Sequence, residues 1–236
     1  MTPPLPGDAG FEPNEGPGPA MVGFDFDGTL AAHRGGWSLL YRLFGVEAAG
    51  DARTDAFWDG ELTYDEWTAG NVADWRDRGV RREHVERAAD AVTFRAGAPD
   101  LLADLRARGV PFGVISAGVR DLIRPVERFD PAFVVANEVV YEDGVPVDVV
   151  GRVPPDSKGP ILERLCDDAG VDPADVVYVG DSPREDGAFE VAGTGVLLDA
   201  EGRVDPDEVE ADHVHEEWDL SGLRSVVLPD DTPNDE

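Results

Sequence analysis

The fold is decided by one short stretch, residues 21–30, which reads Met21-Val22-Gly23-Phe24-Asp25-Phe26-Asp27-Gly28-Thr29-Leu30. Apolar residues lead into a turn that carries two aspartates, and Gly28 gives the backbone freedom just after it. Because side chains alternate along a strand, Asp25 and Asp27 are expected to point the same way. Two unpaired carboxylates are costly to bury, so the pattern predicts a divalent cation beside them. A surface turn that simply favours Asp and Gly is the alternative.

The composition limits the kind of protein that this chain can be. Its 236 residues suffice for one domain, or for one domain with an insert, and 42% of them are hydrophobic. A net charge of −30 makes nucleic acids and anionic membrane surfaces poor partners. No apolar run approaches the roughly 20 residues needed to cross a bilayer, and no signal-peptide pattern is present. A cytoplasmic protein is expected, and the single cysteine, Cys166, excludes internal disulfides.

Successive parts of the chain differ in composition and periodicity. Residues 1–20 are rich in Pro and Gly and are expected to form a disordered tail, as are the acidic residues 227–236. Residues 31–95 show helical spacing and contain four of the five tryptophans, which predicts a compact all-helical insert after the first strand. The core is expected to comprise residues 21–30 and 96–226.

Beyond the insert, predicted helices alternate with short apolar strands. This order favours an α/β fold: a Rossmann-like parallel sheet core with helices on both faces, plus the helical insert. A strand at residues 133–136 and a β-hairpin at 138–150 are also expected. Ligands of parallel sheets bind at the carboxyl ends of the strands. Four polar residues fall at such predicted ends and are expected to meet: Asp25, Asp27, Ser116 and Asp181.

Four short motifs occur in an order that resembles the phosphatase branch of the haloacid dehalogenase-like superfamily. The motifs are Asp25-Phe26-Asp27-Gly28-Thr29, Ser116 after an apolar strand, Lys158 within Ser157-Lys158-Gly159, and Gly180-Asp181-Ser182-Pro183-Arg184-Glu185-Asp186. The resemblance covers roughly residues 21–225. Lys158 is the one lysine among 20 basic residues, and it falls where the motif requires a compact positive charge.

The resemblance implies a catalytic role for three residues. Asp25 would be the nucleophile that forms an aspartyl-phosphate. Asp27 would protonate the leaving group and then activate the water that hydrolyses the intermediate. Lys158 would hold charge between Asp25 and the phosphate. The phosphate would be bound by Ser116, the backbone N–H groups of Ala117 and Gly118, and Lys158.

The resemblance also implies a Mg²⁺ cofactor. Its ligands would come from Asp25, from Asp27 through the backbone carbonyl, and from Asp181. A second acid of the last motif would steady this shell, and Asp186 is preferred over its rival Glu185. Either acid could instead be an ordinary acidic residue at a helix N-terminus.

The helical insert resembles the small cap of phosphoserine phosphatases, which excludes water and selects the leaving group. Two positions depart from that branch. Arg34 stands where those enzymes carry a Glu for the substrate amine, and Asn71 stands where they carry an Arg for the substrate carboxylate. The catalytic part of the resemblance therefore carries over, and the recognition of serine does not. Arg34, Asn71, Trp37 and Trp67 are candidates for a different substrate pocket, unless the tryptophans form the cap core.

The expected function is Mg²⁺-dependent hydrolysis of a small phosphorylated metabolite through an aspartyl-phosphate. A phosphotransferase or mutase on the same scaffold would use the same motifs. A non-enzymatic phospho-receiver or binding protein also has an acidic pocket with Ser and Lys, but receivers are shorter and have no cap. The four histidines show no metal-ligand spacing and are assigned no role. The sequence does not indicate an oligomeric state.

The charge and the lack of lysine suggest adaptation to a salt-rich cytosol. Salt screens the repulsion among the 50 acidic side chains. We therefore expect the protein to unfold at a lower temperature in ~0.1 M KCl than in about 1 M KCl, where the screening length is roughly threefold shorter. Thermal unfolding followed by circular dichroism measures this difference. Equal unfolding temperatures at the two concentrations would contradict the hypothesis.

Overall fold

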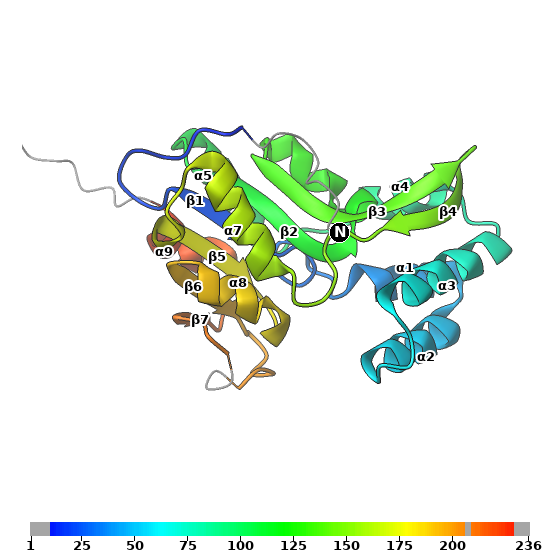
Figure 1. The fold of residues 1–236 in the computed structure, drawn as a ribbon. Helices are drawn as coiled ribbons and strands as arrows, with labels where there is room; N and C mark the ends of the chain where they lie inside the picture. Colours follow the sequence, from blue (N-terminus) through cyan, green and yellow to red (C-terminus); the bar gives the residue numbers. More distant parts are fainter. Residues whose placement is uncertain (1–9, 206–208, 229–236) are drawn as a thin grey trace, which may run out of the picture.

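The computed structural model describes residues 10–205 and 209–228, and its centre is a seven-stranded sheet in the order β4-β3-β2-β1-β5-β6-β7 (Figure 1). The strands are β1 (Met21–Phe24), β2 (Phe112–Val119), β3 (Phe133–Glu142), β4 (Val145–Val150), β5 (Val176–Gly180), β6 (Thr194–Leu198) and β7 (His213–His215). Neighbouring strands are parallel, except that β3 and β4 form an antiparallel hairpin. The predicted α/β class with a Rossmann-like parallel sheet is confirmed.

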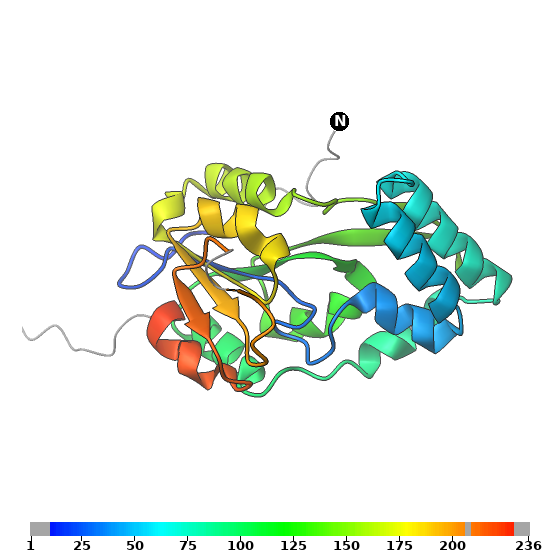
Figure 2. The same cartoon turned by 90° about the horizontal axis from the view of Figure 1, so that it is seen from below.

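Helices cover both faces of the sheet, as Figure 2 shows. One face carries α7 (Lys158–Ala169) and α8 (Asp186–Val191), and the other carries α5 (Ala98–Ala107) and α9 (Arg224–Val227). Leu162 of α7 and Leu102 of α5 are each fully buried in the core on their own face. The remaining α-helices are α1 (Gly36–Phe44), α2 (Glu47–Trp58), α3 (Tyr64–Asp77), α4 (Arg82–Asp90) and α6 (Arg120–Ile123).

Strand β1 lies at the centre of the sheet because every one of its residues can be buried. It pairs with β2 on one side and with β5 on the other, and its burial is complete along its length. Gly23 is required there, since a Cβ at this position would lie 2.7 Å from the Tyr178 ring. The apolar run that opens the quoted stretch thus places the turn after Phe24 at the carboxyl edge of the sheet, where ligands bind.

Residues 31–95 contain α1 to α4, and we propose that they form the cap. Their buried side chains make a third apolar cluster that includes Trp37, Trp67 and Trp75. Helix α3 starts with a capping box, in which Thr63 and Glu66 each bond the other's backbone N–H. This cluster also takes in Val139 of β3, and α3 packs on β4. The predicted strand at 133–136 and the first strand of the predicted hairpin are one continuous strand, β3, whose second half pairs with β4 next to the cap.

The two ends of the described chain are packed on the core. The Phe11 ring lies 5.8 Å from the Phe133 ring between centroids, and the Ala20 N–H donates to the Asp175 carbonyl. At the other end, Val227 and Leu228 are buried. This packing differs from the disorder that composition suggests for residues 10–20 and for the start of 227–236. Residues 1–9 and 229–236 lie outside the described part.

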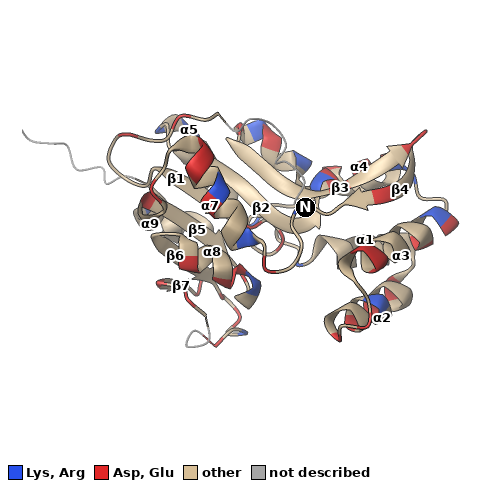
Figure 3. Cartoon of the chain, in the orientation of Figure 1, with Lys and Arg blue, Asp and Glu red and all other residues tan. Residues whose placement is uncertain are grey.

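The high negative charge is spread over the molecule. Acidic residues occur on α7 of the core and on α2 and α3 of the cap (Figure 3). Within residues 10–205 and 209–228, no helix has the length and apolar character to span a membrane. The repulsion among these surface charges weakens as salt is added, because salt shortens the distance over which charges interact.

The start of α7 is fixed by close contact with α8. A Cβ at Gly159 would lie 2.3 Å from the Gly187 carbonyl oxygen, which is backbone and cannot turn away. A Cβ at Gly187 would instead meet nothing nearer than 3.7 Å. The contact therefore requires glycine on α7 and tolerates a side chain on α8. Since Lys158 precedes Gly159, this contact also sets the position of that lysine.

Gly159→Ala is expected to destabilise the protein by about 1–3 kcal/mol, because the added methyl group forces α7 and α8 apart. Gly187→Ala is the matched control and should be neutral or stabilising by up to about 1 kcal/mol, since alanine favours a helix. Denaturant unfolding of both variants in high salt measures the difference. The packing argument fails if both substitutions have the same effect.

Candidate active site

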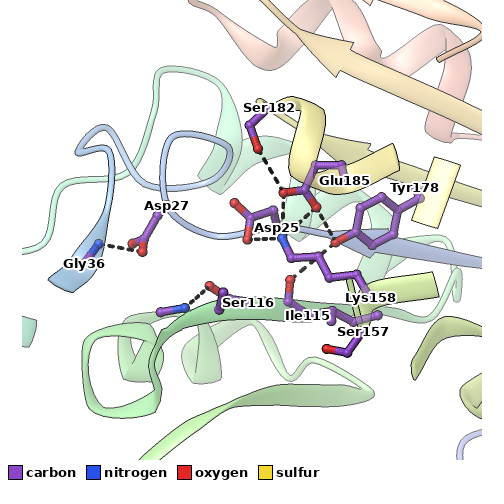
Figure 4. A network of polar contacts seen from close by, with 12 residues as sticks. Asp25, Asp27, Gly36, Ile115, Ser116, Ser157, Lys158, Tyr178, Ser182 and Glu185 are labelled. Atoms are coloured by element: carbon purple, nitrogen blue, oxygen red, sulfur yellow. Dashed lines mark hydrogen bonds and ion pairs between the residues drawn. The ribbon is translucent and has the colours of Figure 1, made fainter. Parts of the chain in front are cut away.

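Four side chains from distant parts of the sequence come together at the carboxyl edge of the sheet, and Figure 4 shows three of them, Asp25, Ser116 and Lys158. Asp25 follows β1, Ser116 lies near the end of β2, Asp181 follows β5, and Lys158 begins α7. Each of them is at most 7% exposed. The chain order alone does not bring these residues together, but the parallel strands do, because all carboxyl ends lie at one edge.

Lys158 is the centre of this cluster. Its Nζ donates to Asp25 Oδ1 over 2.9 Å and to the two oxygens of Glu185 over 2.7 and 2.6 Å. Glu185 is itself 2% exposed and accepts a further hydrogen bond from the Tyr178 hydroxyl over 3.1 Å. Burial alone lowers the pKa of Lys158, but the two carboxylates outweigh it and raise that pKa above its ordinary value. The lysine is therefore held charged.

The carboxylates of the cluster have too little positive charge around them. Burial raises the pKa of Asp25. The positive charge of Lys158 partly offsets this rise, and the negative charge of Asp27 adds to it. Burial and then repulsion from Asp25 raise the pKa of Asp181 to about 7. The pKa of Glu185 is likewise raised to about 7 by burial, against the attraction of Lys158. Lys158, together with Arg34 beside Asp181, faces three buried acids and Asp27, which leaves a deficit of positive charge that a bound cation would offset.

These acids suit Mg²⁺ in the chemistry of their donors. Carboxylate and carbonyl oxygens are its preferred ligands, and it is usually held by one or two carboxylates with water and substrate phosphate rather than by a complete protein cage. Among the described residues, no group of three His, Cys, Asp or Glu side chains is arranged to hold a metal ion. Asp25 and Asp181 lie close enough for each charge to act on the other, and the Lys158 ammonium bonds both Asp25 and Glu185.

Asp27 points away from Lys158 and toward the cap. Its Oδ2 accepts a hydrogen bond of 2.6 Å from the Gly36 N–H at the start of α1, and His33 Nε2 lies 2.9 Å from its Oδ1. The expectation that Asp25 and Asp27 point the same way is wrong, because β1 ends at Phe24 and both aspartates lie in the following turn. Figure 4 shows the two carboxylates directed to different neighbours.

The segment after Ser116 brings a glycine up to Asp27. A Cβ at Gly118 would lie 2.7 Å from Asp27 Oδ2 and 3.2 Å from Ser116 Oγ. The Gly118 N–H donates to Ser116 Oγ over 3.1 Å, so that hydroxyl keeps its own proton to donate elsewhere. The Ala117 carbonyl accepts from Trp37 Nε1 over 3.0 Å and from the Asn137 side chain over 2.7 Å. These bonds fix the irregular last part of β2, at which a phosphate is expected and which we call the phosphate loop.

The structure does not bring Asp186 into the cluster. Its Oδ1 accepts a hydrogen bond of 2.8 Å from the Glu210 N–H on the outer side of α8. A 3₁₀ turn over Pro183–Glu185 directs residue 185 inward, so Glu185 takes the place for which Asp186 was preferred. The preference for Asp186 is corrected accordingly: the acid that meets Lys158 is Glu185.

A cavity of about 210 Å³ lies between the cap and the cluster and ends at Lys158 and Ala117. Trp37 and Trp67 line it, as expected for substrate candidates. Arg34 and Asn71 are not among its lining residues. The Arg34 guanidinium lies 3.4 Å from Asp181 Oδ2, and Asn71 Oδ1 accepts a hydrogen bond of 2.7 Å from Arg53.

Sequence reasoning missed three neighbours of the cluster: His33, Tyr178 and Arg184. His33 lies six positions after Asp27, and the spacing of the histidines in the sequence gives no indication that one of them contacts this acid. Tyr178 is an apolar-looking member of a buried strand, so its hydroxyl gave no signal. Arg184 lies within the last motif and reaches Trp58 of the cap, which only the fold reveals.

Comparison with known proteins agrees with this geometry. The sequence pattern of the haloacid dehalogenase-like hydrolase family matches residues 22–186. A phosphoserine phosphatase of Halobacterium salinarum is 32% identical over 216 residues, which cover 86% of this chain and 95% of that protein. A phosphoserine phosphatase of Methanocaldococcus jannaschii is 28% identical over 75% of this chain and 84% of its own length.

Solved structures give the same result. A phosphoserine phosphatase described as a phospho-aspartyl intermediate analogue superposes with a TM-score of 0.73 at 26% identity, over 90% of this chain and 100% of that chain. A substrate-bound phosphoserine phosphatase complex matches with the same TM-score, identity and coverage. The family match covers more than half of the chain, and the first relative covers most of it. The chain therefore belongs to the haloacid dehalogenase-like hydrolase family, and within it to the phosphoserine phosphatase-like phosphatases.

Proposed function

We propose that this protein is a Mg²⁺-dependent phosphatase that hydrolyses a small phosphomonoester through an aspartyl-phosphate on Asp25. One observation carries the proposal: Lys158 Nζ lies 2.9 Å from Asp25 Oδ1, although 133 positions separate the two residues in the sequence. A buried lysine held on a buried aspartate, at the ligand-binding edge of the sheet, is the arrangement that phosphoryl transfer to a carboxylate needs. The similarity to phosphoserine phosphatases supports it.

Asp25 supplies the attacking oxygen. One of its oxygens, Oδ1, is held by Lys158, so the carboxylate has a fixed orientation. Attack on phosphorus forms an O–P bond to Asp25 and breaks the bond to the alcohol oxygen. The ammonium of Lys158 remains charged throughout and offsets the negative charge of the phosphoryl oxygens beside it.

Asp27 handles the proton. In the first step it delivers a proton to the leaving alkoxide, and in the second it removes one from the water that attacks the aspartyl-phosphate. The Gly36 N–H on Oδ2 and His33 beside Oδ1 hold this carboxylate still. Its position next to Gly118 puts it on the cap side of the phosphate loop, where the leaving group has to depart.

The phosphate is proposed to sit against the end of β2. The Ser116 hydroxyl and the Ala117 N–H border this position, opposite Lys158, while the Gly118 N–H donates to Ser116 Oγ and orients that hydroxyl. Asp25, the Asp27 backbone carbonyl, Asp181 and Glu185 are the groups proposed to hold Mg²⁺, directly or through water. The bound ion would supply positive charge to the phosphoryl oxygens. The cluster itself cannot supply enough, because its acids outnumber its positive side chains.

Asp25→Asn is expected to reduce the Mg²⁺-dependent rate of p-nitrophenol release from p-nitrophenyl phosphate at least about 10³-fold, because an amide is not a nucleophile. The variant should stay folded, since Asn has the same shape and Lys158 keeps Glu185 as partner. Activity is measured in high salt with Mg²⁺ and with a chelator, and the fold by circular dichroism. Activity that survives in the variant, or in the wild type with chelator, would refute the proposal.

The two neighbouring acids of the last motif provide a matched pair. Glu185→Gln is expected to raise the Mg²⁺ concentration for half-maximal activity by about 10- to 100-fold, the usual effect of losing an outer metal partner. Asp186→Asn should leave it within about twofold, because its carboxylate faces the Glu210 N–H. A Mg²⁺ titration of hydrolysis rate compares them. The reverse ranking would restore Asp186 as the motif acid.

A further inference from the structure

We propose that the cavity above Lys158 selects phosphomonoesters of alcohols that carry a flat apolar ring, and that it does not select O-phosphoserine. The inference rests on the proposed function and concerns the leaving group of the same site. It is carried by the walls of the cavity, by the side chains that are absent from them, and by its size.

The groups that would bind an amino acid are engaged elsewhere. Arg34 lies against Asp181, 3.4 Å away. Asn71 is 1% exposed, and its Oδ1 accepts from Arg53, whose other terminal nitrogen donates to Asp74 over 2.7 Å. Neither Arg53 nor Asn71 is among the residues that line the cavity.

Besides Lys158, the charged side chains that line the cavity are Asp156 and Arg184; both are exposed, and Arg184 already stacks on Trp58. The ammonium and carboxylate of a serine leaving group placed among the rings would therefore lose water without gaining a buried partner of opposite charge, which is costly.

The wall on the cap side is made of ring faces. The rings of Trp37 and Trp67 have their centroids 4.8 Å apart, and Phe57 stacks on Trp67 at 5.5 Å. The indole N–H groups are already used: Trp37 donates to the Ala117 carbonyl, and Trp67 donates to Thr54 Oγ1 over 3.1 Å. What remains for a ligand is aromatic surface and the buried Tyr64 hydroxyl, which has no hydrogen-bond partner among the described residues. Aromatic surface binds another ring by offset or edge-to-face contact.

The mouth of the cavity carries a half-exposed tryptophan. Trp58, at the end of α2, is 49% exposed and lines the cavity, and the guanidinium carbon of Arg184 lies 4.4 Å from the centre of its ring. This contact joins the cap to the last motif of the core. The ring therefore has one face on Arg184 and borders the opening through which a ligand reaches Lys158.

The size of the cavity limits the leaving group. Its volume of about 210 Å³ is roughly seven times the volume that one water occupies in the liquid. That space is enough for one ring with a short linker. The ester that fits is therefore small, with its ring among Trp37, Phe57 and Trp67 and its phosphate at Ser116 and Lys158.

Three esters of primary alcohols test this, because their leaving groups are chemically alike: 2-phenylethyl phosphate, butyl phosphate and O-phospho-L-serine. We expect kcat/KM for the phenylethyl ester to exceed that for phosphoserine at least about tenfold, from burial of the ring. Trp58→Ala should raise KM for the phenylethyl ester by about three- to tenfold and leave kcat within about twofold, because stacking on a remote ring acts equally before and in the transition state.

Two variants control for indirect effects. Trp218→Ala removes an equally exposed tryptophan that stacks on Arg95 away from the cavity, and it should leave all three esters unchanged. Trp58→Phe, which keeps an aromatic ring at this position, should leave KM for 2-phenylethyl phosphate close to the wild-type value. Phosphoserine as the better substrate, or an equal loss for all three esters in Trp58→Ala, would overturn the inference while leaving the phosphatase intact. Absence of Mg²⁺-dependent hydrolysis of every ester, p-nitrophenyl phosphate included, would overturn the proposed function itself and the inference with it.

Discussion

The structure of the site depends on one interaction, the contact of Lys158 with Asp25 and Glu185. Three ionisable groups are almost completely removed from water, and the charged form of each would be costly to bury alone. The lysine makes their burial possible, and its place is set by a glycine contact between two helices, not by a loop. The interaction thus couples the packing of α7 on α8 to the orientation of the nucleophile, so that helix packing and catalysis share the same few atoms.

The cap is joined to this cluster at two points. Asp27 accepts from the first backbone N–H of α1, and Trp37 of the same helix donates to the Ala117 carbonyl in the phosphate loop. One helix of the cap therefore positions both the acid–base group and the loop proposed to bind the phosphate. The aromatic cluster that closes the cap also forms the wall of the cavity, which makes cap stability and leaving-group recognition properties of the same side chains.

Much of this was predictable from the sequence, and the exceptions have physical reasons. The strand ends that place Asp25, Ser116 and Asp181 follow from apolar runs with a polar residue after them, and the single lysine follows from composition. The direction of Asp27 did not follow, because strand alternation fails once the strand has ended. The choice between Glu185 and Asp186 depended on a 3₁₀ turn that spacing does not encode. The engagement of Asn71 by Arg53 required knowledge of which helices pack together.

The continuous strand β3 has a consequence for ligand entry. Its first half belongs to the parallel sheet and its second half, paired with β4, supports α3 of the cap. A rigid swing of the cap away from the core would have to bend this strand or strip α3 from the hairpin. At the opposite rim the exposed Trp58 ring rests on the exposed Arg184 side chain, a contact between two surface side chains. We therefore expect ligands to enter and leave on the side of α2, through rearrangement of side chains and not through movement of the whole cap.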